Sequence, residues 1–290
     1  MQKQERRSLA IFPILVLFGL SMAWAGSQGG VTVAGVPLYL AAVGLIFVIQ
    51  WLAFVPAYRQ QSEKFFDLTG SLTYITIMLL TLTLNPLRDA RSYLVAILVI
   101  IWAVRLGSFL YRRVRQAGKD GRFDELKPYF WTFLNVWTLQ ALWVTFTAAA
   151  GLAVLTTANR QALGPFALIG LLLWGIGITI EVIADIQKSR FRANPANKEQ
   201  FIQTGLWRYS RHPNYLGEII LWVGICIIAL PILQGWQWVA LISPVFVTLL
   251  LTRVSGIPLL EQRADTRWGG QEAYEAYKAR TPALVPRFYT

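Results

Sequence analysis

The residues best able to do chemistry lie in one short segment, 205–218, which reads Gly-Leu-Trp-Arg-Tyr-Ser-Arg-His-Pro-Asn-Tyr-Leu-Gly-Glu. It contains His212, the one histidine of the chain. Pro213 disfavours helical geometry in the residue before it and is well tolerated in a first helical turn, so a helix should begin there. The free N–H groups and partial positive charge of such a helix start suit an anion. The segment therefore predicts a ligand-binding loop.

Basic and aromatic residues surround His212 in this loop. Arg208 and Arg211 offer positive charge, and Tyr209 and Tyr215 offer rings and hydroxyl groups. A single histidine beside a loop proline often has only a structural role. We interpret His212 as facing a cofactor because of its neighbours, and the structural role remains the alternative.

Acidic residues recur at helical spacing on either side of the loop. Glu181 and Asp185 are four residues apart and therefore share one face of a helix. Asn214, Glu218 and Trp222 repeat that spacing after Pro213. Carboxylates accept hydrogen bonds from sugar hydroxyls, and arginine binds phosphate bidentately. Two acidic stripes near a basic loop predict a ligand with ribose hydroxyls and phosphates, and a structural network of ion pairs is the alternative.

The composition points to a membrane protein. Of the 290 residues, 55% are hydrophobic and only 14% are charged, against about 25% in a typical soluble domain. This apolar content excludes a disordered chain. It also argues against a nucleic-acid-binding domain, although the net charge is +12. With one cysteine, Cys226, and one histidine, the chain has no disulfide within itself and no cysteine- or histidine-rich metal centre, so we expect no metal.

About eight apolar stretches are long enough, or nearly so, to cross roughly 30 Å of hydrocarbon. Lipid offers no partner to free backbone groups, so these spans should be helices. The predicted fold class is an all-α, polytopic helical bundle that forms a single membrane domain. The stretches are 9–25, 36–56, 68–85, 92–111, 129–156, 164–183, 215–231 and 236–252.

The basic residues predict an orientation. The loops on one side hold only Arg88, Arg91 and Arg160, and nearly all other Lys and Arg residues fall on the opposite side. Since positive charge accumulates in cytoplasmic loops, both chain ends should be cytoplasmic. The first stretch also resembles a signal peptide that ends at Ala23-Trp24-Ala25. We expect it to be retained as a helix, and cleavage would leave seven spans.

Charged side chains inside the spans are few, and by this topology all lie toward the cytoplasmic ends. Because such charges are costly in lipid and usually face the bundle interior, they should converge on one cytoplasm-facing cavity. The alternative, strongest for Arg253 and Asp185, is that they extend to water at the interface. The five residues are Arg105, Glu181, Asp185, Glu218 and Arg253.

The segment 205–218 resembles the C-terminal signature of the steroid 5α-reductase and sterol reductase superfamily, in particular its bacterial DUF1295-like membrane branch. The likeness extends over roughly 90–290 and includes Trp102-Ala-Val-Arg105-Leu, Glu181-Val-Ile-Ala-Asp185 and Ser255-Gly-Ile-Pro-Leu-Leu-Glu261. The resemblance implies a bacterial cytoplasmic-membrane enzyme. It would take a hydride from NADPH in a cytoplasm-facing cavity and reduce a carbon–carbon double bond of a flat lipophilic molecule that enters from the bilayer.

The resemblance also implies particular cofactor contacts. Asp185 and Arg192 would contact NADPH from a loop after the sixth span, and Asn214 and Glu218 would contact the nicotinamide end. Arg105 and Arg253 match basic residues of the family. Together with the interpretation above, the candidate cofactor-binding residues are Arg105, Glu181, Asp185, Arg192, Tyr209, Arg211, His212, Asn214, Glu218 and Arg253.

The substrate-binding part departs from the family. Steroid 5α-reductases polarise the substrate carbonyl with a Glu/Tyr pair on earlier helices, and Trp102 stands where that tyrosine would be. Asp67 and Tyr74 are the remaining candidates for the catalytic groups. A steroid-like or other polycyclic or isoprenoid substrate therefore stays open.

Two other functions compete with the reductase. Isoprenylcysteine and phospholipid methyltransferases, which are more distantly related, also place an Arg-His-Pro-x-Tyr loop at a helix start, where it holds S-adenosylmethionine. A membrane scaffold or transporter without enzymatic activity is the third possibility. NADPH affinity without affinity for S-adenosylmethionine would favour the reductase.

Overall fold

The computed structural model describes residues 3–117 and 121–286, which are mostly helical. The chain divides into two compact units. Unit 1 comprises Met1–Ala167 and Ile228–Ser243, and unit 2 comprises Leu168–Ile227 and Pro244–Thr290. Each unit is described by itself.

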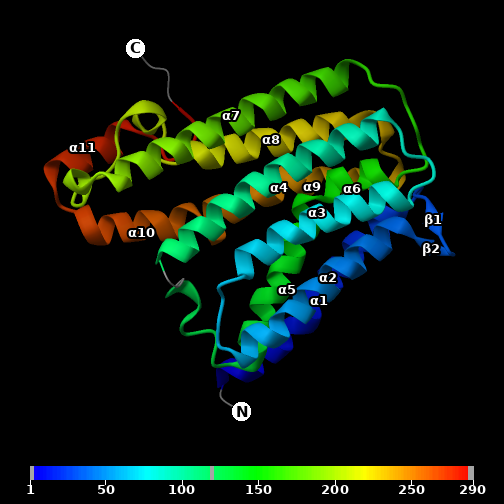
Figure 1. Cartoon of the computed structure of the whole chain (residues 1–290), viewed down its shortest axis with the longest axis horizontal. Helices are drawn as coiled ribbons and strands as arrows, with labels where there is room; N and C mark the ends of the chain where they lie inside the picture. Colours follow the sequence, from blue (N-terminus) through cyan, green and yellow to red (C-terminus); the bar gives the residue numbers. More distant parts are fainter. Residues whose placement is uncertain (1–2, 118–120, 287–290) are drawn as a thin grey trace. The chain divides into compact units, whose positions relative to one another are not determined.

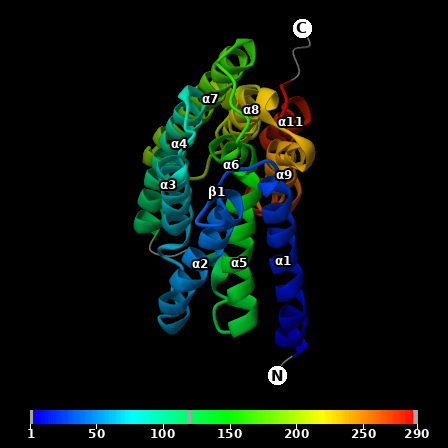
Figure 2. The same ribbon diagram turned by 90° about the vertical axis from the view of Figure 1, so that its right-hand side faces the viewer.

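Unit 1 is a bundle of long helices (Figure 2). Helices α1, α2 and α5 pack against one another, and α3 packs against α2 and α4. A two-residue hairpin, β1 (Thr32–Val33) and β2 (Val36–Pro37), joins α1 to α2. The helices are α1 (Lys3–Ser27), α2 (Leu38–Arg59), α3 (Phe66–Leu84), α4 (Ala90–Ala117), α5 (Phe130–Thr147) and α6 (Ala149–Thr156), with short helical turns at Gly121–Phe123, Leu230–Ile232 and Gly235–Leu241.

Unit 2 is built on two long helices, α7 (Pro165–Ala193) and α8 (Pro213–Ala229), which run side by side (Figure 1). Two shorter C-terminal helices, α10 (Ile257–Trp268) and α11 (Glu272–Arg280), complete it. The remaining turns are η2 (Pro195–Asn197), η3 (Gly205–Arg208) and a π-helical turn, η6 (Leu250–Val254), which follows α9 (Ile242–Leu249).

The predicted all-α membrane fold is confirmed. Within the described residues, seven helices are long and apolar enough to cross a membrane, if the successive helical turns of Gly235–Trp268 are taken as one. The bent pair α5–α6 would bring the number to eight. The stretch 129–156 is therefore not one straight helix, because its two halves meet at an angle of 59°. The segment 184–193, predicted as loop, continues α7 to Ala193. Arg190 and Arg192 in its last turn favour this extension because cations stabilise a helix C-terminus.

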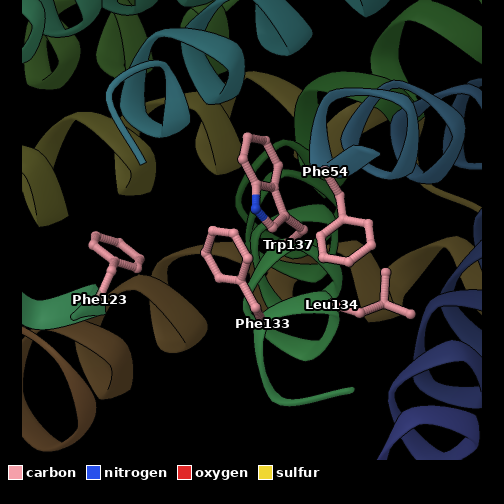
Figure 3. Packing of buried hydrophobic residues seen from close by; sticks show 5 residues of the cluster. All are labelled: Phe54, Phe123, Phe133, Leu134 and Trp137. Carbon is pink, nitrogen blue, oxygen red and sulfur yellow. The ribbon is translucent and has the colours of Figure 1, made fainter. Parts of the chain in front are cut away.

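Aromatic side chains form a core in unit 1. Phe133 and Trp137 follow each other by one helical turn on α5, and Figure 3 shows them beside Phe54 of α2. The ring centroids of Phe54 and Phe133 are 5.9 Å apart in an edge-to-face arrangement, which suits the ring quadrupoles. Phe123 and Leu134 complete the cluster.

The first helix is packed into this unit. Gly19 and Gly26 of α1 lie directly under the rings of Phe47 and Tyr39, so that no Cβ would fit at either glycine. Nδ2 of Asn135 donates to the carbonyl oxygen of Ser8 at 2.8 Å and joins α1 to α5. Small residues at such contacts let membrane helices approach closely.

Arg91, predicted for an outer loop, is a buried structural residue of α4 with 2% of its surface exposed. Its Nη1 donates to the carbonyl oxygen of Ile228 at 2.6 Å, and its Nη2 donates to that of Ala162 at 2.8 Å. These bonds connect three segments of unit 1 that are far apart in sequence.

Replacing Arg91 with leucine should lower the free energy of unfolding by about 2–4 kcal/mol, because two carbonyl groups lose their donors. Arg88 is the matched control, since it is exposed and makes a single 3.2 Å bond to the carbonyl oxygen of Thr83. Arg88→Leu should change stability by less than about 0.5 kcal/mol. Thermal unfolding in detergent can be followed by labelling of the buried Cys226, the only thiol in the chain. Equal melting temperatures for the two variants would contradict this role.

Candidate functional site

The candidate site of unit 2 begins with a contact between the backbones of α7 and α8. A Cβ added at Gly177 would lie 2.5 Å from the amide nitrogen of Leu221 and 2.6 Å from the carbonyl oxygen of Gly217. A Cβ added at Gly217 would lie 2.5 Å from the carbonyl oxygen of Gly177. Gly224 makes a similar approach to α7 two turns further on. These glycines set the spacing and register of the two helices.

This contact brings the backbone of Glu181 on α7 close to the residue that precedes Glu218 on α8. The amide nitrogen of Glu181 would lie 2.7 Å from a Cβ at Gly217, and Glu218 is the next residue along α8. Glu181 and Glu218 have only 2% and 7% of their surface exposed, and Asp185, one turn further along α7, has 5%. These three carboxylates are buried on two helices that touch, and their convergence on a cofactor stays a prediction.

The loop before α8 is docked on α7 by its own backbone. Gly205 has a φ of +61°, a left-handed conformation that favours glycine, and a Cβ added there would lie 2.5 Å from Nε2 of Gln187. Oε1 of Gln187 accepts from the amide of Leu206 at 2.9 Å. The indole of Trp207 donates to the carbonyl oxygen of Ala184 at 3.1 Å. Helix α7 thus holds the start of the loop in place.

Helix α8 begins at Pro213, as the sequence predicts. The carbonyl oxygen of His212 accepts from the amide of Tyr215 at 3.1 Å, which closes the first turn. The rings of His212 and Tyr215 stack, with centroids 5.7 Å apart and planes at 10°. Tyr209 is 53% exposed, and Asn214 is half-buried.

Arg211 binds groups of the protein itself, whereas we expected it to bind a phosphate of the cofactor. Its Nε and Nη2 donate to the carboxylate of Glu261 at 3.2 and 2.9 Å. Its Nη1 donates to the carbonyl oxygens of Lys278 and Thr281 at 3.0 and 2.7 Å. Arg211 therefore joins the loop to α10 and to the end of α11, and its role toward a cofactor remains a prediction.

Glu261 is the residue that the sequence interpretation left without a role. It lies on α10 and binds both Arg211 and His212, whose Nε2 is 2.7 Å from Oε1 of the carboxylate. The sequence did contain an indication of this role, because partly buried cations such as Arg211 require a carboxylate partner. Its distance of about 50 residues from the loop concealed the pairing.

The environment of His212 disfavours the charged form of its ring. His212 is 5% exposed, and burial lowers its pKa below the usual 6.5, with smaller contributions from the charges of Lys188 and Arg211. The hydrogen bond and charge of Glu261 oppose this shift without cancelling it. A neutral imidazole bound to a carboxylate carries its proton on the bonded nitrogen, so Nε2–H donates to Glu261.

The lowered pKa of His212 predicts that the protein becomes less stable in mild acid. Because the unfolded chain then binds more protons than the folded one, the free energy of unfolding should fall as the pH drops below 6.5. The free energy of unfolding should stop falling once the pH is below the pKa of His212 in the folded protein. Melting temperatures from about pH 7.5 to about pH 5.5 test this, and His212→Gln should remove most of the dependence. A wild-type profile that is flat over this range would contradict it.

The other predicted residues are distributed over both units. In unit 2, Arg192 and Arg253 are exposed, and Arg253 lies in the π-helical turn. In unit 1, Arg105 lies on α4, and Asp67 lies in the first turn of α3.

Tyr74 of α3 is buried, and its ring meets that of Trp102 edge-to-face at 5.1 Å. The structure thus brings the candidate Tyr74 to the tryptophan that replaces the family tyrosine. Among residues 3–117 and 121–286, no three or more His, Cys, Asp or Glu side chains form a group that could hold a metal ion.

The fold and the site together define a polytopic helical membrane protein with buried carboxylates and a buried histidine at a helix start. The chain belongs to the DUF1295 family, described as proteins of unknown function, whose model matches residues 53–281. This match begins earlier in the chain than the resemblance that the motifs indicated.

Two curated proteins are similar to parts of the chain. A probable O-methyltransferase, ustE of Ustilaginoidea virens, is 28% identical over 118 residues, which cover 34% of this chain and 42% of the relative. An uncharacterised protein of Schizosaccharomyces pombe is 25% identical over 187 residues, which cover 53% of this chain and 54% of the relative. The chain thus spans about half or less of the length of these relatives. No solved structure matches it.

Proposed function

We propose that the protein is a membrane enzyme that uses NADPH to reduce a carbon–carbon double bond of a lipophilic substrate, with the cofactor bound from the cytoplasmic side. The observation that supports this most is the burial of Glu181, Asp185 and Glu218 on α7 and α8, two helices whose backbones touch. Buried carboxylates are suitable acceptors for ribose hydroxyls. Arg192 and Arg253 are exposed and would supply positive charge to phosphates.

NADPH supplies the hydride in such a reaction, and the protein must supply a proton to the second carbon. Tyr74 is our candidate proton donor, and Asp67 is the second candidate. Tyr74→Phe removes only the hydroxyl group. It should lower turnover at least tenfold and leave NADPH affinity unchanged, because general acid catalysis typically contributes about 100-fold or more. Unchanged turnover in both Tyr74→Phe and Asp67→Asn would remove these residues from the mechanism.

The exposed arginines provide a direct test of phosphate binding. Arg192→Gln and Arg253→Gln should each weaken NADPH binding by about 1.5–3 kcal/mol, the usual contribution of a charged hydrogen bond. Arg280→Gln is the control. Arg280 is the last residue of α11 and is also exposed, but its guanidinium donates to the side chain of Gln203. Calorimetry in detergent measures all three affinities. If neither Arg192→Gln nor Arg253→Gln binds more weakly than the control, the phosphate assignment is wrong.

A methyltransferase that uses S-adenosylmethionine is the second candidate. The similarity to a probable O-methyltransferase supports it. The site also favours it in one respect, because buried carboxylates attract the sulfonium and ammonium groups of that cofactor. Calorimetric titration of the same sample with NADPH and with S-adenosylmethionine separates the two functions. Binding of neither cofactor, together with an unaltered phenotype for Asn214→Ala, would favour a protein without enzymatic activity.

A further inference from the structure

Unit 1 contains a cleft that the proposed function does not use. The cleft has a volume of about 290 Å³ and lies where α4 and α7 begin, lined by residues 89–91 and 160–163. The candidate catalytic residue Asp67 is in the first turn of α3, whereas the cleft lies beyond the last residue of that helix, Leu84. A helical segment of this length separates the two places by roughly 25 Å.

Two arginines with little exposure line this cleft, and one carboxylate accompanies them. Arg91 is 2% exposed, and the side chain of Arg160 is 19% exposed. Asp89 lies 3.4 Å from Nη1 of Arg160 and also accepts from the amide and the hydroxyl of Ser92 at 2.9 and 2.7 Å. Arg91 donates to carbonyl oxygens alone within the described part of the chain. Because buried charges are normally paired, the cleft retains an excess of one positive charge.

The Nε atoms of Arg91 and Arg160 support the same conclusion. Both atoms are shielded from solvent, and neither has a hydrogen-bond acceptor among residues 3–117 and 121–286. The protein itself therefore satisfies the two guanidinium groups incompletely, which is costly for charged groups away from water. The charge of the two groups, rather than a shielded Nε atom, would attract an anion to the cleft.

Two long helices begin beside this cleft. Helix α4 has 28 residues and α7 has 29. The carboxylate of Asp89 compensates the start of α4, because it accepts from the amide of Ser92. The segment 157–168, which leads into the first turn of α7, contains no acidic residue. The start of α7 therefore adds partial positive charge at the same place.

The cleft lies at the depth of lipid headgroups. The apolar spans of α4 and α7 begin at Ala90 and Pro165, so the cleft is at one end of each span. Phospholipid phosphates lie at this level, just outside the hydrocarbon core. Large apolar side chains near the cleft are between 46 and 48% exposed and would suit acyl chains; they are Leu87, Leu163 and Phe166.

We propose that this cleft binds a phosphate group, and that its ligand is an anionic phospholipid whose headgroup lies beside Arg160 while its chains cover the exposed apolar side chains. Arg91 contributes positive charge and keeps its structural bonds to the two carbonyl oxygens. The inference is independent of the proposed function, because neither NADPH nor S-adenosylmethionine takes part in it. Free phosphate shares the chemistry of the headgroup, so the experiment must separate the two sources.

Native mass spectrometry of the full-length protein in detergent measures the binding of phosphatidylglycerol. Diacylglycerol with the same acyl chains is the neutral comparison, since it lacks the charged headgroup. The wild-type protein should bind phosphatidylglycerol at least about tenfold more tightly than diacylglycerol, because the headgroup meets an uncompensated charge. Inorganic phosphate is titrated separately, and its binding is followed as a rise in melting temperature through labelling of Cys226.

Two substitutions change the charge of the cleft. Arg160→Gln removes a positive charge and should weaken phosphatidylglycerol binding about tenfold. It also removes the bonds of Arg160 to the carbonyl oxygens of Val154 and Thr157, which can disturb folding. Gln161→Glu is therefore the second variant. Gln161 is exposed and lines the cleft, so the new carboxylate opposes an anion while every bond of the two arginines is kept, and the loss of affinity should be similar.

Arg88→Gln is the matched control, because it changes the net charge of the chain by the same amount as either cleft variant. Arg88 is exposed and is not part of the lining of the cleft. This variant should bind phosphatidylglycerol within about twofold of the wild-type protein.

The outcomes distinguish the site from its ligand. Weaker binding of phosphatidylglycerol to Gln161→Glu than to Arg88→Gln supports the lipid site. If only inorganic phosphate responds to Gln161→Glu, the cleft binds free phosphate and the lipid assignment is wrong. If both ligands bind equally to the wild-type protein, Gln161→Glu and Arg88→Gln, the proposal is overturned and the two arginines have a structural role alone.

Discussion

Gly217→Val should be among the most damaging single substitutions in unit 2. Its Cβ would lie 2.5 Å from the carbonyl oxygen of Gly177 and 2.7 Å from the amide nitrogen of Glu181. Both are backbone atoms of α7, so the two helices must separate rather than a side chain rotate. We expect a loss of about 3 kcal/mol in the free energy of unfolding, at the upper end of the usual effect of overpacking. Glu181 and Glu218 would move apart, and cofactor affinity should fall at the same time.

Gly175→Val is the matched control for this prediction. Gly175 lies on the same helix as Gly177, two residues earlier, and no atom lies within 4 Å of the place where its Cβ would be. The same side chain should therefore be accommodated there with little change. Thermal unfolding followed by labelling of Cys226 compares the two variants. If Gly217→Val melts within a degree or two of Gly175→Val, the close approach of α7 and α8 does not determine the geometry of the site.

Glu261→Ala should have the second largest effect. The substitution leaves the guanidinium of Arg211 and the Nε2–H of His212 without their common acceptor. Half-buried charged hydrogen bonds contribute about 1.5–3 kcal/mol, and removal of one partner leaves the other uncompensated. We expect a destabilisation of about 3 kcal/mol, which lowers the melting temperature of a chain of this size by several degrees.

An exposed ion pair on the same helix provides the comparison. Asp265 lies one turn after Glu261, 2.7 Å from Nζ of Lys278, and the side chains are 46% and 28% exposed. Water screens such a pair, so Asp265→Ala should have an effect of less than about 1 kcal/mol. Melting temperatures of Glu261→Ala and Asp265→Ala test this difference in stability. A larger effect at Asp265 than at Glu261 would mean that the link from the loop to α10 contributes little to the stability of unit 2.

Much of the fold follows from the sequence through local rules. Runs of about 20 apolar residues must be helical in lipid, since no other structure satisfies their backbone groups, and the predicted spans correspond to the helices observed. Pro213 predicted correctly where α8 begins. The spacing of Glu181 and Asp185 placed them on one face, because helical geometry relates residues i and i+4 without reference to the rest of the chain.

The partners across the site depended on the tertiary structure. Helix periodicity could not show that Gly177 and Gly217 touch, since both are unremarkable within their own helices. Nor could the motif around Arg211 and His212 show that one carboxylate on α10 engages both. The sequence by itself determined the membrane class, the helices and the chemical types available at the site. Only the tertiary structure decided which charges are paired and which ring nitrogen of His212 meets a carboxylate, because these depend on contacts between residues distant in the chain.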